Sequence, residues 1–165
     1  MFIAHLPAGY LTARGAERCG AKHPLLMAAC LLGSIAPDFD LLYFYLVDSC
    51  RHHHHSYCIH WPVVWLGLLL LSLLWLLWHR GGVAIPAVAF SASGLLHIAL
   101  DGIVGDIQLF APWSDEYYAL ATVPALHKPW WLNFFLHWSM GIELLICSLA
   151  AGLFIMRLRK RPQHP

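Results

Sequence analysis

The sequence is poor in charge. Charged residues make up 12% of its 165 positions, and the formal net charge at pH 7 is +1. Soluble domains usually carry about 25% charged residues, so this composition is typical of a membrane protein. Because a nucleic-acid-binding protein needs a concentrated basic surface to neutralise phosphates, the near-neutral chain is not expected to bind nucleic acid.

Several motifs of soluble proteins are also missing. The 5 cysteines form no C-x-x-C pair, so a zinc finger or a thioredoxin-like site has no support. There is no G-x-S-x-G pattern, which argues against a serine nucleophile. No internal repeat or linker divides the chain, and we expect residues 1–165 to form a single membrane-embedded domain.

What the chain does have is long apolar runs. A helix needs about 20 residues to cross a bilayer, and several segments reach or approach that length. They predict an all-α, multi-pass membrane helical bundle of about four spans. The apolar segment Met1–Leu11 is too short to span, and it predicts an additional N-terminal helix that is re-entrant or lies on the surface. The four segments are Pro24–Val47, Pro62–Trp78, Val83–Val104 and, roughly, Phe134–Met156.

The basic residues predict an orientation. The C-terminal tail, residues 157–165, is rich in Arg and Lys and is expected in the cytoplasm by the positive-inside rule. Counting back through the spans puts Met1–His23 and the turn at Arg80 on the same side. Segment 105–133, whose acids outnumber its single lysine, then lies outside.

Two apolar segments contain ionisable residues, which are costly in a membrane and usually mark function. In the first, Asp38 and Asp40 follow Pro37. Proline removes a backbone donor and bends a helix, so we expect the two carboxylates at a helix break. Paired oxygen donors there suit a divalent cation; the alternative is that they cap the amides of a kink.

In the third segment, His97 and Asp101 are four residues apart and share a helical face. This spacing lets both side chains bind one ion, or lets the aspartate orient the histidine. The alternative is an isolated buried hydrogen bond, and these residues alone do not decide between the two.

Histidine is the most unusual feature. The 12 histidines outnumber both the 10 basic and the 9 acidic residues, and four of them form the run His52–His55. Neutral imidazole is a common zinc ligand, but neighbouring side chains point apart, so at most one or two of the run bind the same ion. The alternative for each is a solvated loop residue. His5 is a further candidate, although a lone histidine in an apolar segment is more often a core residue.

In the four-span topology these residues converge at the outer end of the bundle. Their order resembles the YdjM-like family of inner-membrane proteins, which are classed as metal-dependent hydrolases and of which one member is described as LexA-binding. His52 and His54 stand where that family has glycine and threonine, so His55 is the best-matched ligand, with His52 or His54 as substitutes. The resemblance covers roughly the first two-thirds of the chain. Its elements are His5, Pro37–Asp40, Arg51 with His55 and Ser56, and His97–Asp101, followed by Gly105 and Pro112.

The resemblance implies a metal-dependent hydrolase in the inner (cytoplasmic) membrane, and the basic tail predicts that its C-terminus is cytoplasmic. It implies a distant likeness in fold to zinc-dependent phospholipase C and single-strand nucleases, and hence hydrolysis of a lipid or lipid-linked phosphoester by metal-activated water. Asp40, bridging two ions, and His55 are the expected catalytic residues. About one to three divalent ions, with zinc preferred, would bind to the implied ligands. These ligands are His5, Asp38, Asp40, His55, His97 and Asp101.

Other functions fit the same residues. The chain is alternatively a non-catalytic metal-binding protein or a metal transporter, or a regulatory protein whose polar residues only hold its helices together. His5 raises a conflict, because a cytoplasmic Met1–His23 cannot easily reach an outer site. Either the N-terminal segment dips into the membrane, or the orientation is inverted, or His5 is not a ligand.

Overall fold

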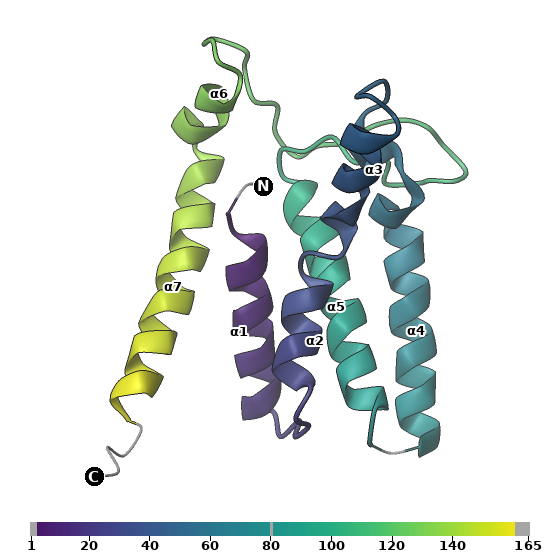
Figure 1. Ribbon diagram of the computed structural model, residues 1–165, viewed down its shortest axis with the longest axis vertical. Helices are drawn as coiled ribbons and strands as arrows, with labels where there is room; N and C mark the ends of the chain where they lie inside the picture. The colour runs from purple at the N-terminus through teal and green to yellow at the C-terminus, as the bar shows by residue number, and fades with distance from the viewer. Residues whose placement is uncertain (1–2, 80, 161–165) are drawn as a thin grey trace.

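The computed structural model describes residues 3–79 and 81–160, which form helices and no strand (Figure 1). The all-α prediction is confirmed. Arg80 and residues 161–165 lie outside the described residues. The α-helices are α1 (His5–Arg18), α2 (Leu26–Gly33), α3 (Asp40–Leu46), α4 (Pro62–His79), α5 (Ala84–Asp101), α6 (Trp131–Leu136) and α7 (Ser139–Arg159). Short 3₁₀ turns are η1 (Pro37–Phe39), η2 (His54–Ser56) and η3 (Cys58–His60).

Candidate membrane spans match the predicted apolar segments. Among the described residues, 3 helices are long and apolar enough to cross a membrane, namely α4, α5 and α7. A fourth candidate is the pair α2 and Pro37–Leu46, which is bent by 55° at a short break and is either a broken span or a re-entrant loop. Leu70, Leu71 and Leu74 of α4 are more than half exposed, as expected for a helix covered by lipid.

The helices pack side by side in an order that differs from their order in the chain. α4 packs on α5, α5 packs on α2, α2 packs on α1, and α1 packs on α7. The C-terminal ends of α1 and α7 and the turn between α4 and α5 lie together at one end of the bundle (Figure 1). We call this the basic end. Its described basic residues are Arg14, Arg18, Lys22, Arg157, Arg159 and Lys160.

The N-terminal helix α1 is a short helix inside the bundle. Its 14 residues measure about 21 Å, less than the roughly 30 Å of a bilayer core. α7 holds it at both ends: Glu143 accepts a hydrogen bond from the Ile3 amide at 2.6 Å, and Arg157 pairs with Glu17 at 2.9 Å. His5 and the basic residues of α1 therefore lie at opposite ends of one helix, which removes the conflict over His5.

Close packing between α2 and α5 depends on Gly33. A β-carbon at this position would collide with the carbonyl oxygen of Phe90, so only glycine lets the two backbones come this near. The close approach sets the break that follows α2 against the upper half of α5. It thereby positions Asp38 opposite His97.

Candidate metal centre

Four ionisable side chains meet at the end of the bundle opposite the basic end. Asp38, His60, His97 and Asp101 each offer a ligand atom, and these atoms lie within 4.8 Å of one another. Nε2 of His97 lies 2.9 Å from Oδ2 of Asp101, and Nε2 of His60 lies 3.9 Å from the same oxygen. Metal–ligand bonds of 2.0–2.2 Å place two ligands of one ion at most about 4 Å apart, so these separations suit a single ion.

The imidazole rings are oriented by hydrogen bonds on the side away from this centre. Nδ1 of His97 donates to the Ser34 carbonyl at 2.8 Å, and Nδ1 of His60 donates to Oδ2 of Asp40 at 2.6 Å. Nδ1 of His55 donates to the carbonyl of Gly105. In each ring Nε2 is then the nitrogen that keeps a lone pair for a metal, an arrangement typical of metal-binding histidines.

The helix break explains why the Ser34 carbonyl is available. Pro37 has no amide hydrogen, and the amide of Asp38 bonds to the Ile35 carbonyl at 3.2 Å. The Ser34 carbonyl consequently has no amide donor among the described residues, and the imidazole Nδ1–H of His97 bonds to it instead. The predicted break at Pro37 thus serves the site twice, by exposing a carbonyl and by presenting Asp38.

Burial keeps two histidines of the site neutral. His60, His97 and Asp101 are at most 2% exposed. Burial lowers the pKa of His55 and of His60 to about 4, so both rings are uncharged at neutral pH. Nε2 of His60 is buried without a hydrogen-bond partner among the described residues. A buried polar atom of this kind is costly, and a bound metal ion would satisfy it.

A second group of ligand atoms adjoins the first. His54, His55 and His60 also bring their ligand atoms within 4.8 Å of one another, so His60 belongs to both groups. The ring centroids of His55 and His60 are 4.7 Å apart. The donor set fits zinc or a similar ion, because it combines imidazoles with carboxylates.

Every predicted ligand lies at this centre, but two of them are in supporting positions. Oδ2 of Asp40 faces Nδ1 of His60, which is the geometry of a carboxylate that orients a metal-binding histidine. Nε2 of His5 lies 3.2 Å from Oδ1 of Asp101, and its ring stacks on His97 with centroids 3.7 Å apart. Neither Asp40 nor His5 belongs to the two ligand groups found among the described residues.

The start of the histidine run points away from the centre. His52 is exposed, and its Nδ1 lies 2.7 Å from Oδ1 of Asp48. The second carboxylate oxygen of Asp48 accepts the amides of Arg51 and His52 at 2.9 Å each. The His52 amide is the main reason that the pKa of Asp48 is lowered to about 2. Asp48 therefore fixes the loop, and His52 takes no part in the ligand groups.

Sequence reasoning does not assign His60 as a ligand, although it is a fifth histidine close to the run of four. No motif marks it. Two indole N–H groups fold the loop so that His60 turns inward: Trp61 donates to the Ser56 carbonyl at 3.1 Å, and Trp65 donates to the Ile59 carbonyl at 2.6 Å. The signal that was available is its place two residues before Pro62, the first residue of α4.

A helical membrane protein with a buried histidine–aspartate centre is the class that this fold and site define. Residues 1–162 match the family described as YdjM inner membrane protein. The chain therefore belongs to the YdjM family, as its motifs predicted. No curated protein and no solved structure matches the chain, so the expected likeness to zinc-dependent phospholipase C stays a prediction.

Proposed function

We propose that the protein is a hydrolase that uses a divalent metal, preferably zinc, to cleave a phosphoester. The observation that carries the proposal is a cavity of about 510 Å³ lined by Asp38 and Asp101, which are members of the ligand group. A structural zinc site is closed by protein ligands, whereas a catalytic one keeps a position open. The cavity favours the catalytic alternative, because water and substrate can reach the ligand atoms.

A divalent metal held here would act as a Lewis acid and lower the pKa of a coordinated water. The side chains of the site would bind the ion and hold its ligands in place. Burial lowers the pKa of His54 to about 4, so this ring is neutral at the cavity wall and keeps a nitrogen lone pair to offer to an ion. Asp40 and the Gly105 carbonyl hold His60 and His55 in the orientation that the reaction needs.

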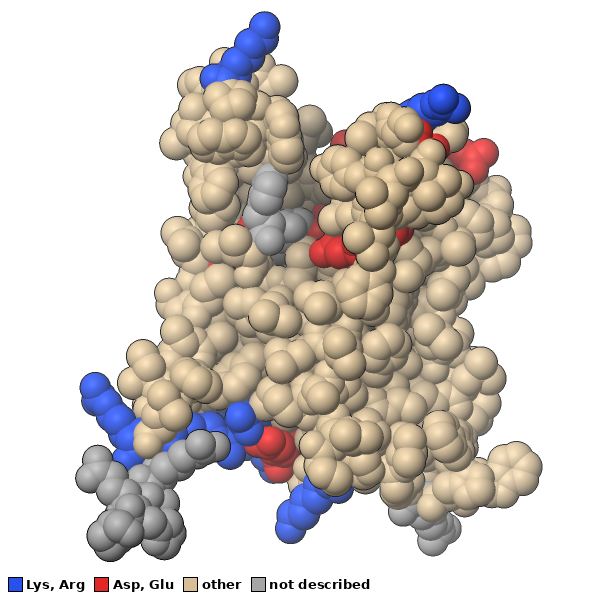
Figure 2. Space-filling model, viewed as in Figure 1, with Lys and Arg blue, Asp and Glu red and all other residues tan. Residues whose placement is uncertain are grey.

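The charge distribution supports the predicted orientation. On the face seen in Figure 2, Lys and Arg gather at the basic end. The opposite end has Arg51 and Lys128 as its described basic residues. By the positive-inside rule the basic end is cytoplasmic, so the metal centre lies near the outer surface of the membrane. A reporter fused to the C-terminus tests this directly.

The test of function is metal content together with phosphate release. Detergent-purified protein should contain stoichiometric metal and hydrolyse phosphoesters, and Asp38→Ala and His97→Ala should abolish hydrolysis and lower metal content. Asp115→Ala is the matched control, because this exposed carboxylate lies outside the ligand groups. Chelation should stop the reaction and zinc should restore it. Folded wild-type protein that contains no metal and binds none would overturn the proposal.

The alternatives give different results in the same experiments. A transporter would move metal ions into proteoliposomes without releasing phosphate. A protein that uses these residues only to hold its helices would keep its activity when His97 and Asp101 are replaced together by apolar residues.

A further inference from the structure

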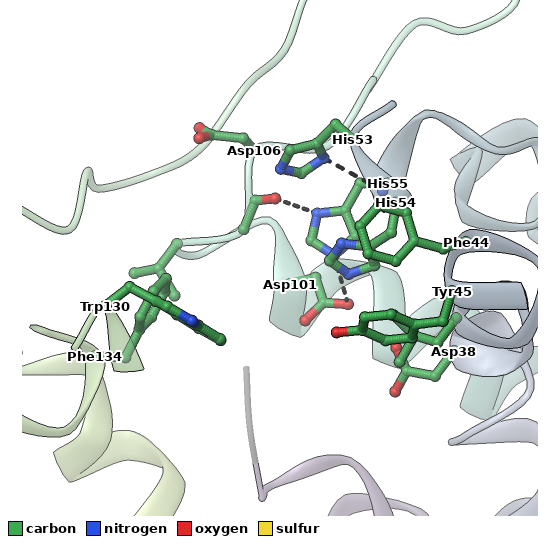
Figure 3. A pocket seen from close by; sticks show the side chains of 13 residues that line it. Asp38, Phe44, Tyr45, His53, His54, His55, Asp101, Asp106, Trp130 and Phe134 are labelled. Atoms are coloured by element: carbon green, nitrogen blue, oxygen red, sulfur yellow. Dashed lines mark hydrogen bonds and ion pairs between the residues drawn. The ribbon is translucent and has the colours of Figure 1, made fainter. Parts of the chain in front are cut away.

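The cavity beside the metal centre has two kinds of wall. Its floor holds carboxylates and imidazoles of the centre, and its sides are apolar and aromatic (Figure 3). One side comes from α3, and the other comes from α6 and the residue before it. Figure 3 shows Phe44 and Tyr45 facing Trp130 and Phe134 across the space, with Asp101 between them. The apolar lining is Leu41, Phe44, Tyr45, Val104, Trp130 and Phe134.

Both sides of the cavity continue into surface that lipid would cover. On α3, Leu42 and Leu46 are 64% and 79% exposed. Beyond the cavity on the other side, Leu136 and Trp138 are 65% and 55% exposed. Apolar exposure of this extent is unfavourable in water, and aromatic residues such as Trp138 favour the membrane interface. The cavity is therefore bordered on both sides by side chains suited to contact with lipid.

From these features we propose that the ligand of the cavity is a phosphorylated lipid, which enters sideways between α3 and α6. This inference rests on the proposed function for the metal centre. The phosphate lies on the floor at the centre, and the first part of the lipid chain lies between the aromatic walls. A volume of about 510 Å³ is within the usual range for ligand pockets of roughly 300–1,000 Å³, so the rest of a long chain remains in the bilayer.

The charges of the lining explain why the metal is needed for binding. The described residues that line the cavity include no Lys or Arg, whereas Asp38, Asp101 and Asp106 are acidic. An anionic phosphate is therefore repelled unless divalent ions neutralise these carboxylates. The same acids repel a small soluble phosphate ester such as glycerol 3-phosphate, which has no acyl chain to offset the repulsion.

The experiment compares a lipid with its soluble headgroup. Zinc-loaded full-length protein in nanodiscs is given long-chain phosphatidate or glycerol 3-phosphate, and both phosphate release and equilibrium binding are measured, with and without chelator. We expect metal-dependent binding of phosphatidate and a much higher kcat/KM for it than for glycerol 3-phosphate. Tyr45→Ala and Trp130→Ala, one from each wall, should raise the KM and the Kd for phosphatidate about tenfold. Trp78→Ala is the control, since this residue is 86% exposed at the other end of α4.

The outcomes separate the two proposals. Equal kcat/KM for lipid and headgroup, or wall variants that match the control, would overturn the lipid inference and leave the hydrolase intact. Metal-dependent lipid binding that the wall variants weaken, without hydrolysis of either compound, would support the ligand and overturn the hydrolase. Failure of the metal-loaded protein to bind phosphatidate would overturn the inference whatever the activity.

Discussion

The two parts of the histidine-rich loop differ in what surrounds them. His52 is exposed and bonds to Asp48 in the same loop, whereas His55 and His60 are 5% and 0% exposed and lie among carboxylates from α5 and the helix break. All three have an Nδ1 partner. What distinguishes the buried pair is that Nε2 of each ring points toward Asp101 and the other ligand atoms. The comparison indicates that burial and convergence, more than the number of histidines, make a metal site.

The largest effect should follow loss of a buried ring. His60→Ala removes the residue shared by both ligand groups, and we expect metal binding to weaken more than about 100-fold. His52→Ala serves as the control in the same loop. Metal content by elemental analysis and a zinc competition titration measure the difference. Equal metal content in the two variants would contradict the distinction between buried and exposed histidines.

Replacing the carboxylate behind His60 should have a smaller effect. In Asp40→Asn the side-chain oxygen can still accept the hydrogen bond from His60, but the negative charge is gone. We expect metal affinity to fall by about 10- to 100-fold. This variant also tests the prediction that Asp40 bridges two ions. If Asp40 is a direct ligand of two ions, Asp40→Asn should lower metal affinity as much as His60→Ala does. The purified Asp40→Asn protein should then also lack one of the two ions.

A substitution at a residue that is not a ligand should also disturb the buried part of the histidine-rich loop. A β-carbon on Gly105 would lie 2.8 Å from Cε1 of His55 and 2.7 Å from the Asp101 carbonyl, so Gly105→Ala must push the ring away. We expect about a tenfold loss of metal affinity, as for loss of an orienting group. Gly67→Ala is the control, because a β-carbon there meets no atom within 4 Å. Unchanged affinity in Gly105→Ala would mean that His55 is not a ligand.

The spans could be predicted from the sequence because a membrane helix satisfies its backbone hydrogen bonds within one segment. Hydropathy alone therefore located α4 and α5 closely, and Pro37 marked the break in the first span. The predicted fourth segment began earlier than α7, because the extended backbone of His137 separates α6 from it.

The site could be predicted only in part. Asp38, His97 and Asp101 carried a signal, because charge is rare in apolar spans. His60 and the supporting role of Asp40 depend on how a loop of 3₁₀ turns folds against distant helices, and no local pattern records those contacts. The same is true of α1, whose position inside the bundle depends on packing against α2 and on contacts with α7 at both of its ends.

The smallest effect on metal binding should come from His52, at the exposed start of the histidine run. His52→Ala removes a ring at the surface, but Asp48 still accepts the amides of residues 51 and 52, so the loop keeps its shape. We expect stoichiometric metal and unchanged affinity. Asp48→Ala removes the carboxylate oxygen that accepts both amides, and it should lower affinity a few-fold by loosening the chain that leads to His55. If His52→Ala released metal while Asp48→Ala did not, the ring itself would be a ligand, and burial would not be what selects the metal-binding histidines.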